Sequence, residues 1–194
     1  MSTTPSLATG APLTPETWAD FVTRLRHDCV GDGVDRHYTA DALFTVEARK
    51  IDTGIDLEFA DKKLVYREDS RWFSPLEFWE QADQDERNEL STMAANYGTE
   101  PCLFTELAAH AQWEMLGDMP GCTVTGWVER WEYVNAHLTR DAADAFIARK
   151  KHDYRQGIRV YVESQCYAWE FNAIKEAILS GRLVFSEKEE GTPI

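Results

Sequence analysis

The chain has 194 residues, 43% of them hydrophobic, and a formal net charge of −14. At this length, one domain with an insertion is the expected organisation. The negative charge excludes a nucleic-acid binder that works by bulk electrostatic attraction, and no run of eighteen apolar residues could span a membrane.

The two ends of the chain and its cysteines indicate a cytoplasmic protein. Residues 1–13 hold Ser, Thr, Pro and Gly without an apolar signal-peptide core, so we expect a disordered tail there, and a flexible tail over 187–194. The cysteines are scattered and form no CxxC pair, which is typical of reduced cytoplasmic thiols. A single domain over 14–186 is the resulting prediction.

The first predicted elements are a helix and two strands. A Thr-Pro pair at 14–15 suits the start of a helix, and apolar residues then recur at helical spacing over 18–29. Residues 43–50 alternate between apolar and polar side chains, which predicts a half-buried strand. Residues 64–67 predict a shorter strand that forms a hairpin-like pair with it.

The segment 70–120 is predicted to be a helical insertion. A capping box at 74–77 begins a helix that we expect to continue to about residue 97, with Leu76, Trp79 and Leu90 in its buried stripe. Residues 52–106 hold 14 acidic and 5 basic side chains, a formal charge of −9. Because exposed charges contribute little to stability, reversing several acids of this helix to lysine should leave folding nearly intact.

The segment 124–180 is predicted to alternate strand and helix. Residues 131–138 and 158–163 alternate with period two, and Thr139 caps the helix between them. A crossover helix of this length can join parallel strands in a right-handed unit. The whole chain is therefore predicted as α+β: a small mixed sheet with a C-terminal βαβα unit, packed helices and the acidic helical insertion.

Two surfaces are candidates for binding. The first is the acidic side of the inserted helix, which could engage a basic protein groove. Its predicted contact residues are Glu77, Glu80, Asp83 and Glu86. The second is the polar and aromatic face of the two C-terminal strands, where side chains could stack on a base and bond its edge, unless the first helix or the insertion covers that face. Its predicted ligand-binding residues are Tyr133, Asn135, His137, Arg159 and Tyr161.

The sequence supports no catalytic or metal site. His27 and Cys29 are about 200° apart on a helix, so they cannot share a metal ion while helical. Cys166 follows a strand, but the Gly-rich nucleophile elbow is absent, and there is no phosphate-binding glycine loop. We therefore expect no cofactor, no metal and no enzymatic activity.

Two blocks of sequence resemble small acidic proteins encoded by bacteriophages, prophages and plasmids. The first block contains HYTADALFTV, followed by GID and Asp61, and the second contains WEYVNAHLT, AFIARKKH, RVYVES and WEFNAI. The resemblance covers about half of the chain and implies an accessory gene of a mobile element that acts in the bacterial cytoplasm. Small acidic proteins of this class often inhibit host defence systems.

These observations predict a non-enzymatic accessory protein of a phage or mobile element. It would bind a basic host protein that handles nucleic acid or serves in defence, by an acidic surface that imitates nucleic-acid charge, with no direct nucleic-acid binding. The alternative is a nucleotide or small-ligand binding module that uses the aromatic sheet face.

Overall fold

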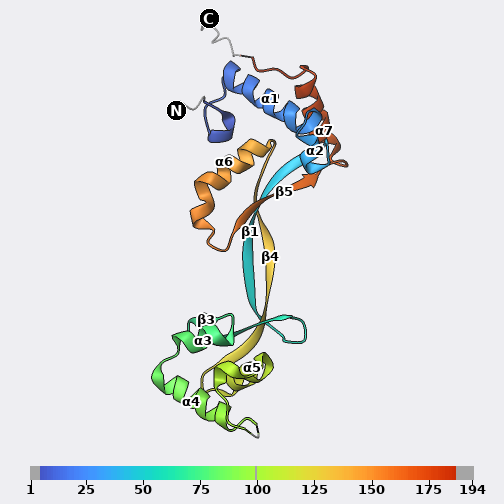
Figure 1. Ribbon diagram of the computed structural model, residues 1–194. Coiled ribbons are helices and arrows are strands. Elements are labelled where there is room, and N and C mark those ends of the chain that lie inside the picture. The colour runs from blue at the N-terminus through green and yellow to red at the C-terminus, as the bar shows by residue number, and fades with distance from the viewer. Residues whose placement is uncertain (1–4, 99, 187–194) are drawn as a thin grey trace, which may run out of the picture. The chain divides into compact units, whose positions relative to one another are not determined.

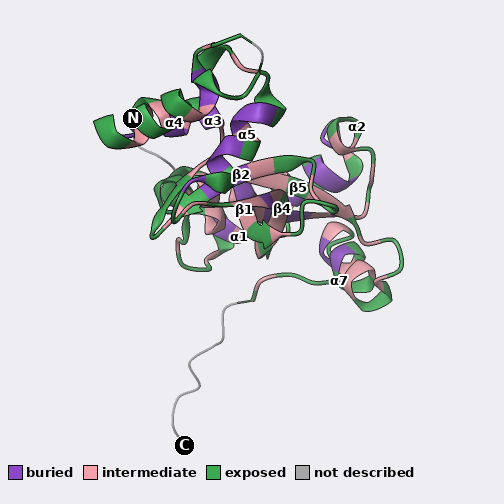
Figure 2. Cartoon of the chain, turned by 90° about the horizontal axis from the view of Figure 1, so that it is seen from below, coloured by how far each residue is buried: buried purple, intermediate pink, exposed green. Residues whose placement is uncertain are grey.

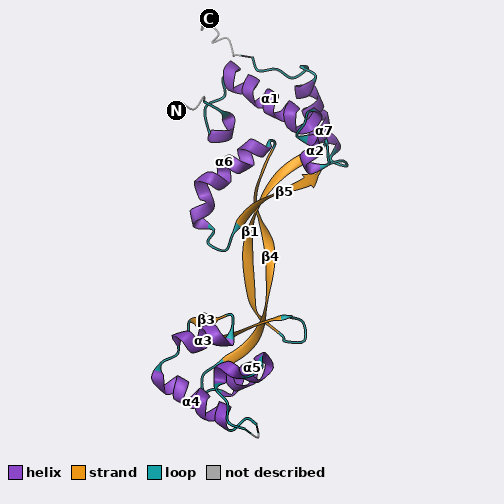
Figure 3. Cartoon of the chain, viewed as in Figure 1, coloured by secondary structure: helices purple, strands orange, loops and turns teal. Residues whose placement is uncertain are grey.

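The computed structural model describes residues 5–98 and 100–186, so the predicted tail over 187–194 lies outside the described residues. The strands are β1 (Ala42–Ile55), β2 (Lys62–Arg67), β3 (Ser70–Trp72), β4 (Thr123–His137) and β5 (Ile158–Ser164). The helices are α1 (Pro15–Val30), α2 (Val34–His37), α3 (Pro75–Gln81), α4 (Gln84–Ala95), α5 (Ala109–Asp118), α6 (Arg140–Lys150) and α7 (Trp169–Leu179) (Figures 1 and 3). Short 3-10 turns lie at Leu7–Thr9, Phe104–Glu106 and Lys151–Asp153. The predicted α+β class is confirmed.

The strands form one sheet in the order β3-β2-β4-β1-β5, and the pairings of β1 with β5 and of β2 with β3 and β4 are antiparallel. The chain divides into two compact units: residues 1–50 with 131–194 (unit 1), and residues 51–130 (unit 2). The long strands β1 and β4 each contribute residues to both units. The helical insertion predicted over 70–120 falls inside unit 2.

In unit 1, α6 covers one face of the sheet. The side chains of Phe44 and Val46 on β1 are fully buried, and Ala143 of α6 packs against them. Val160 and Val162 of β5 and Phe146 of α6 complete this core.

The pairings of β1 with β5 and of β2 with β3 and β4 are antiparallel, so the mixed sheet that the sequence predicted is wrong. The predicted hairpin-like pair of β1 with β2 is also wrong, because β4 lies between them. The helix α6 connects β4 to β5, as predicted, but these two strands are not neighbours. The strand β1, whose side chains are the most buried of the unit's strands, lies between them.

A second layer of unit 1 is formed by α1 and α7. Leu25 and Cys29 of α1 pack against Ile178 of α7, as the helical spacing of the apolar residues predicts. Lys175 of α7 is also buried, and its ammonium donates to the Asp41 carboxylate at 2.7 Å and to the Ala40 carbonyl at 2.9 Å. This pairing ties α7 to the start of β1, because an unpaired buried ammonium would be strongly destabilising.

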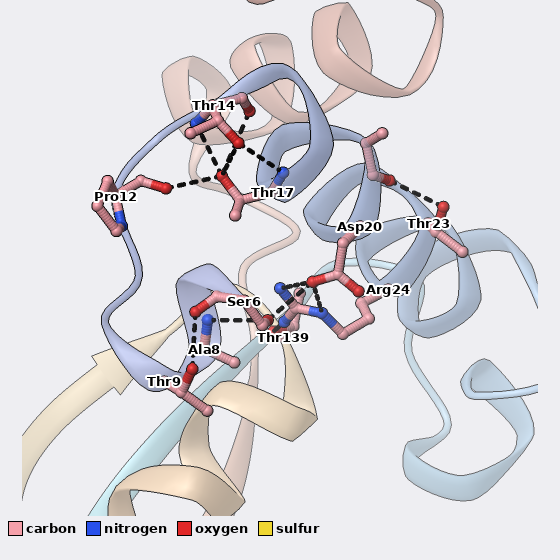
Figure 4. Close-up of polar contacts among 11 residues, drawn as sticks. Ser6, Ala8, Thr9, Pro12, Thr14, Thr17, Asp20, Thr23, Arg24 and Thr139 are labelled. Atoms are coloured by element: carbon pink, nitrogen blue, oxygen red, sulfur yellow. Dashed lines mark hydrogen bonds and ion pairs between the residues drawn. The ribbon is translucent and has the colours of Figure 1, made fainter. Parts of the chain in front are cut away.

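The segment before α1 differs from the tail that the sequence predicted over 1–13. Its Ser6 hydroxyl donates to the Asp20 carboxylate of α1 at 2.8 Å, and Ser6 also caps the turn that follows it (Figure 4). The Arg24 guanidinium donates to the same carboxylate and also to the Thr139 hydroxyl, the latter at 2.8 Å. The described residues 5–13 are therefore ordered. Composition alone could not predict this, because it does not show that a serine meets a carboxylate on a later helix.

In unit 2, the predicted helix over 74–97 is two helices. Ala82 has an extended conformation and Asp83 is the N-cap of α4, so the chain turns after α3. The turn also changes the buried face of α3: Phe78 is 1% exposed, whereas Leu76 is 46% exposed. Leu90, Phe104 and the buried residues of α5 complete this core; Figure 2 colours these residues by burial.

Gly126 marks a close approach of backbones in unit 2. A Cβ at this position would collide with the Ala60 side chain and would lie 2.8 Å from the Ile55 carbonyl oxygen. At Gly117 in α5 such a Cβ would make an ordinary van der Waals contact, since its nearest atom is a Val124 methyl 3.8 Å away. The two glycines therefore form a matched pair for a test.

We predict that Gly126→Ala lowers the free energy of unfolding by about 1–3 kcal/mol, because the backbone of Ile55 must move to make room. Gly117→Ala should raise it by up to about 1 kcal/mol, because alanine favours the helical state more than glycine. Urea unfolding of both variants beside the parent measures the difference. Equal stability of the two variants would contradict the close packing at Gly126.

Candidate functional site

Three of the four predicted acidic contact residues have roles in the fold. The Glu77 carboxylate accepts from the Phe73 amide at 2.7 Å. Asp83 and Glu86 form a reciprocal capping box: the Asp83 carboxylate accepts from the Glu86 amide at 2.9 Å, and the Glu86 carboxylate accepts from the Asp83 amide at 2.8 Å. Glu86 also forms an ion pair with Arg67. The four acids lie on two helices, because the chain turns at Ala82.

The negative charge of unit 2 is nevertheless large. Its residues include 17 acids and 6 bases, a formal charge of −11, whereas unit 1 has 17 acids and 14 bases, a charge of −3. Several bases of unit 2 are already paired: Lys62 with Glu129, Arg67 with Glu86, and Arg130 with Asp52. Glu80 of α3 and Asp85 and Glu89 of α4 are exposed. They belong to the uncompensated charge of this unit.

The structure revises the expected effect of charge reversal. We predict that Asp83→Lys combined with Glu86→Lys lowers the free energy of unfolding by about 1–2 kcal/mol, because the cap of α4 and the ion pair with Arg67 are lost. The matched control, Glu80→Lys with Glu89→Lys, makes the same change in charge at exposed positions. Urea unfolding of the control should differ from the parent by no more than about 0.5 kcal/mol. Equal losses in both double variants would refute the capping role.

The second predicted surface lies on the face of the unit 1 sheet that points away from α6. The β1–β5 register places Thr45 opposite Tyr161 and Glu47 opposite Arg159. Since alternate residues of a strand share a face, Glu47 and Arg49 lie on the same side as Arg159 and Tyr161. Trp131 of β4 joins them, because both arginines lie over its ring. We call this set, together with Tyr133, the open sheet face.

Arg159 is the centre of the open sheet face. Its guanidinium lies 4.1 Å from the centre of the Trp131 ring and 5.3 Å from that of Tyr161. Its Nε and Nη2 atoms both donate to one Glu47 carboxylate oxygen at 2.8 Å. Ring contact and ion pair restrict the side chain together, so Arg159 is preorganised without a ligand.

The tyrosines of this face are accessible. Tyr133 is 63% exposed and Tyr161 is 47% exposed, so neither α1 nor any other helix of unit 1 covers them. The Arg159 side chain keeps 41% of its surface exposed despite its contacts. The face therefore presents two free aromatic rings beside arginine side chains.

The sequence predicted that Asn135 and His137 belong to this face, but His137 lies apart from the tyrosines and arginines. His137 ends β4, and its ring lies beside Phe146 of α6, with 5.8 Å between the ring centres. Its Nε2 atom is 3.1 Å from the Asn135 amide oxygen, and the two side chains pair with each other. Burial, and then the nearby Arg149, lower the pKa of His137. His137 instead lines a separate cavity of about 340 Å³ with residues of α1 and α6.

Sequence reasoning missed Glu47 and Arg49. The alternation over 43–50 placed both on one face of a strand, but it could not show that this strand pairs with β5. Only that pairing brings the Glu47 carboxylate to Arg159.

The cysteines and the metal-binding side chains were the other candidates for a site. All four cysteines are free, and burial raises the pKa of Cys29 and of Cys122, which disfavours their thiolates. Within residues 5–98 and 100–186, no three His, Cys, Asp or Glu side chains are grouped so as to hold a metal ion. None of the helices in that range is long and apolar enough to cross a membrane.

No protein-family model, no curated protein and no solved structure matches this chain. The open sheet face is therefore the main guide to function.

Proposed function

We propose that the protein is a non-enzymatic binding module whose ligand-binding surface is the open sheet face, and that its ligand is a nucleotide. The observation that supports this proposal best is the pair of exposed tyrosines, Tyr133 and Tyr161, beside an arginine fixed on Trp131 by Glu47. A nucleotide combines a flat ring with a phosphate, and this face offers a partner for each.

The aromatic rings supply the greater part of the expected affinity. Stacking of a base on an exposed aromatic ring contributes about 1–3 kcal/mol. Tyr133 and Tyr161 come from strands on either side of β1, so roughly 10 Å separates their strands. A base can therefore stack on one tyrosine while the remainder of the nucleotide lies over β1.

The arginines supply the charge. Arg49 and Arg159 lie on this face, and by strand alternation the carboxylates of Glu47 and Glu163 do too, so a phosphate would bind through the guanidinium groups themselves rather than through a net positive charge. Because salt screens interactions beyond about 8–10 Å, a phosphate on this face responds mainly to these near groups. Lys50 and Glu132 pair with each other at 3.3 Å and, by the same alternation, lie on the opposite face of the sheet.

We predict that Tyr133→Ala combined with Tyr161→Ala weakens nucleotide binding by about tenfold, because the double variant removes both stacking surfaces. Adenosine, guanosine, cytidine and uridine monophosphates are the probes, and ligand-observed NMR with isothermal titration measures the dissociation constants. Tyr167→Ala is the matched control, since Tyr167 is exposed but lies outside the sheet. Its affinity should equal that of the parent.

Two results would reject the nucleotide proposal. One is that the parent protein binds none of the four monophosphates. The other is that the double variant of Tyr133 and Tyr161 binds them as tightly as the parent does, which would place the ligand elsewhere.

The charge of unit 2 favours a second candidate function. With a charge of −11, unit 2 fits a basic groove of a host protein that handles nucleic acid or serves in defence. In this second proposal the chain is an accessory protein of a phage or mobile element that acts in the bacterial cytoplasm. The exposed acids of α3 and α4 would form the contact with the host protein. The capping acids Asp83 and Glu86 would contribute charge but could not be exchanged freely.

We predict that immobilised protein captures basic proteins from a bacterial lysate at about 0.1 M salt and releases them at about 1 M, where the screening length falls to about 3 Å. The Glu80→Lys, Glu89→Lys double variant should capture less, because steering depends on summed charge. Mass spectrometry of the captured proteins measures the effect. Capture that is unchanged in the double variant, or insensitive to salt, would reject the acidic contact.

A further inference from the structure

The strand β5 is an edge of the sheet. Within the described residues the strand order ends at β5, which pairs with β1 on one side and with no strand on the other. Its residues Ile158, Val160 and Val162 are only partly buried, although they pack on the core beneath α6. The strand has no proline and no lysine, which commonly protect a sheet edge, and its charged residues are Arg159 and Glu163.

The hydrogen bonds to β1 show which groups of β5 point outward. The Arg49 amide donates to the Gly157 carbonyl at 2.9 Å, and the Gln165 amide donates to the Asp41 carbonyl at 2.8 Å. In an antiparallel ladder such bonds recur at every second residue, so the odd-numbered residues of β5 bond to β1. The backbone groups of the even-numbered residues, Val160 and Val162 among them, are directed to the free edge.

The sequence of β5 is complementary to itself. If two copies pair antiparallel about Tyr161, all seven residues of the strand find a partner, with Val160 opposite Val162 of the second copy. Arg159 then lies opposite Glu163 of the second copy, on the same face as Tyr161. In this register the outward N–H and C=O groups of the even-numbered residues face those of the second copy, as an antiparallel ladder requires. Shifting the register by two residues would leave the Arg159–Glu163 pairing unmade and shorten the ladder.

We propose that β5 pairs with β5 of a second copy of this chain, about a two-fold axis at Tyr161. Such an interface is isologous, because Arg159 contacts Glu163 in both directions. The axis stands perpendicular to the sheet, so the open sheet faces of both copies lie on one side and form a single surface. Each copy then supplies Tyr161 to the middle of the platform. The pairing itself does not depend on the nucleotide proposal.

The first test is the oligomeric state against concentration, measured by sedimentation equilibrium. The parent protein should form a dimer in a concentration-dependent equilibrium. Glu163→Lys should raise the dissociation constant of the dimer by about tenfold, because two opposite-charge pairs become like-charge pairs. Glu176→Lys is the matched control: it makes the same change in charge at an exposed position of α7, and it should leave the dissociation constant unchanged.

The second test fixes the register by a disulfide bond. In a Cys166→Ser background, Tyr161→Cys places two thiols across the axis at a pair whose Cα atoms are about 4.5 Å apart, within reach of a disulfide. Oxidation should therefore link this variant into a covalent dimer. Tyr167→Cys, an exposed position beyond the end of β5, should cross-link no faster than random collision allows.

A parent protein that is monomeric at every accessible concentration would overturn the proposal. So would a Glu163→Lys variant that dimerises as well as Glu176→Lys, or a Tyr161→Cys variant that cross-links no faster than Tyr167→Cys. Nucleotide titration of monomeric Glu163→Lys separates the two proposals, since Tyr133 and Tyr161 remain in that variant.

Discussion

Unit 1 depends on the alternation of side chains along β1. The even-numbered residues Phe44 and Val46 are buried beneath α6, and each such side chain contributes about 1.5–3 kcal/mol when it leaves water. This burial fixes the register, because a slip by one residue would turn the apolar side chains to solvent. With the register fixed, Glu47 must lie opposite Arg159. Core packing on one side of the strand thus positions the charged and aromatic groups on the other side.

The carboxylates of unit 2 serve both folding and surface charge. Asp83 and Glu86 cap α4, and Glu77 binds the amide of Phe73 before α3. Carboxylates suit these places because helix N-termini present unpaired amides and a positive dipole end. The acids outside these positions, such as Asp85 and Glu89, are exposed. Acidic composition therefore does not mark every carboxylate as an interaction residue.

The unequal charges of the two units relate the candidate surfaces to each other. Unit 1 is nearly balanced, so its open sheet face can present arginines without a surrounding excess of acid. Unit 2 carries −11 and would repel a polyanion. The acidic excess is thus concentrated in unit 2, whereas the arginines of the open sheet face belong to unit 1.

Local patterns in the sequence determined the α+β class, the start of α1 at the Thr-Pro pair of 14–15, and parts of two strands. β1 continues beyond the predicted 43–50 to Ile55, and β4 begins at Thr123, before the predicted 131–138. The predicted features depend on side-chain periodicity and capping chemistry within a few residues of each other. The sequence also identified Tyr133, Arg159 and Tyr161 as residues of one sheet face. Only the tertiary structure decided that β1 lies between β4 and β5, that the helix predicted over 74–97 turns at Ala82, and that His137 packs beside Phe146. It also decided that Ser6 binds Asp20 and that Glu47 holds Arg159. The physical reason is that these contacts join residues far apart in the chain, and which of them form depends on the burial of the whole core rather than on any local pattern.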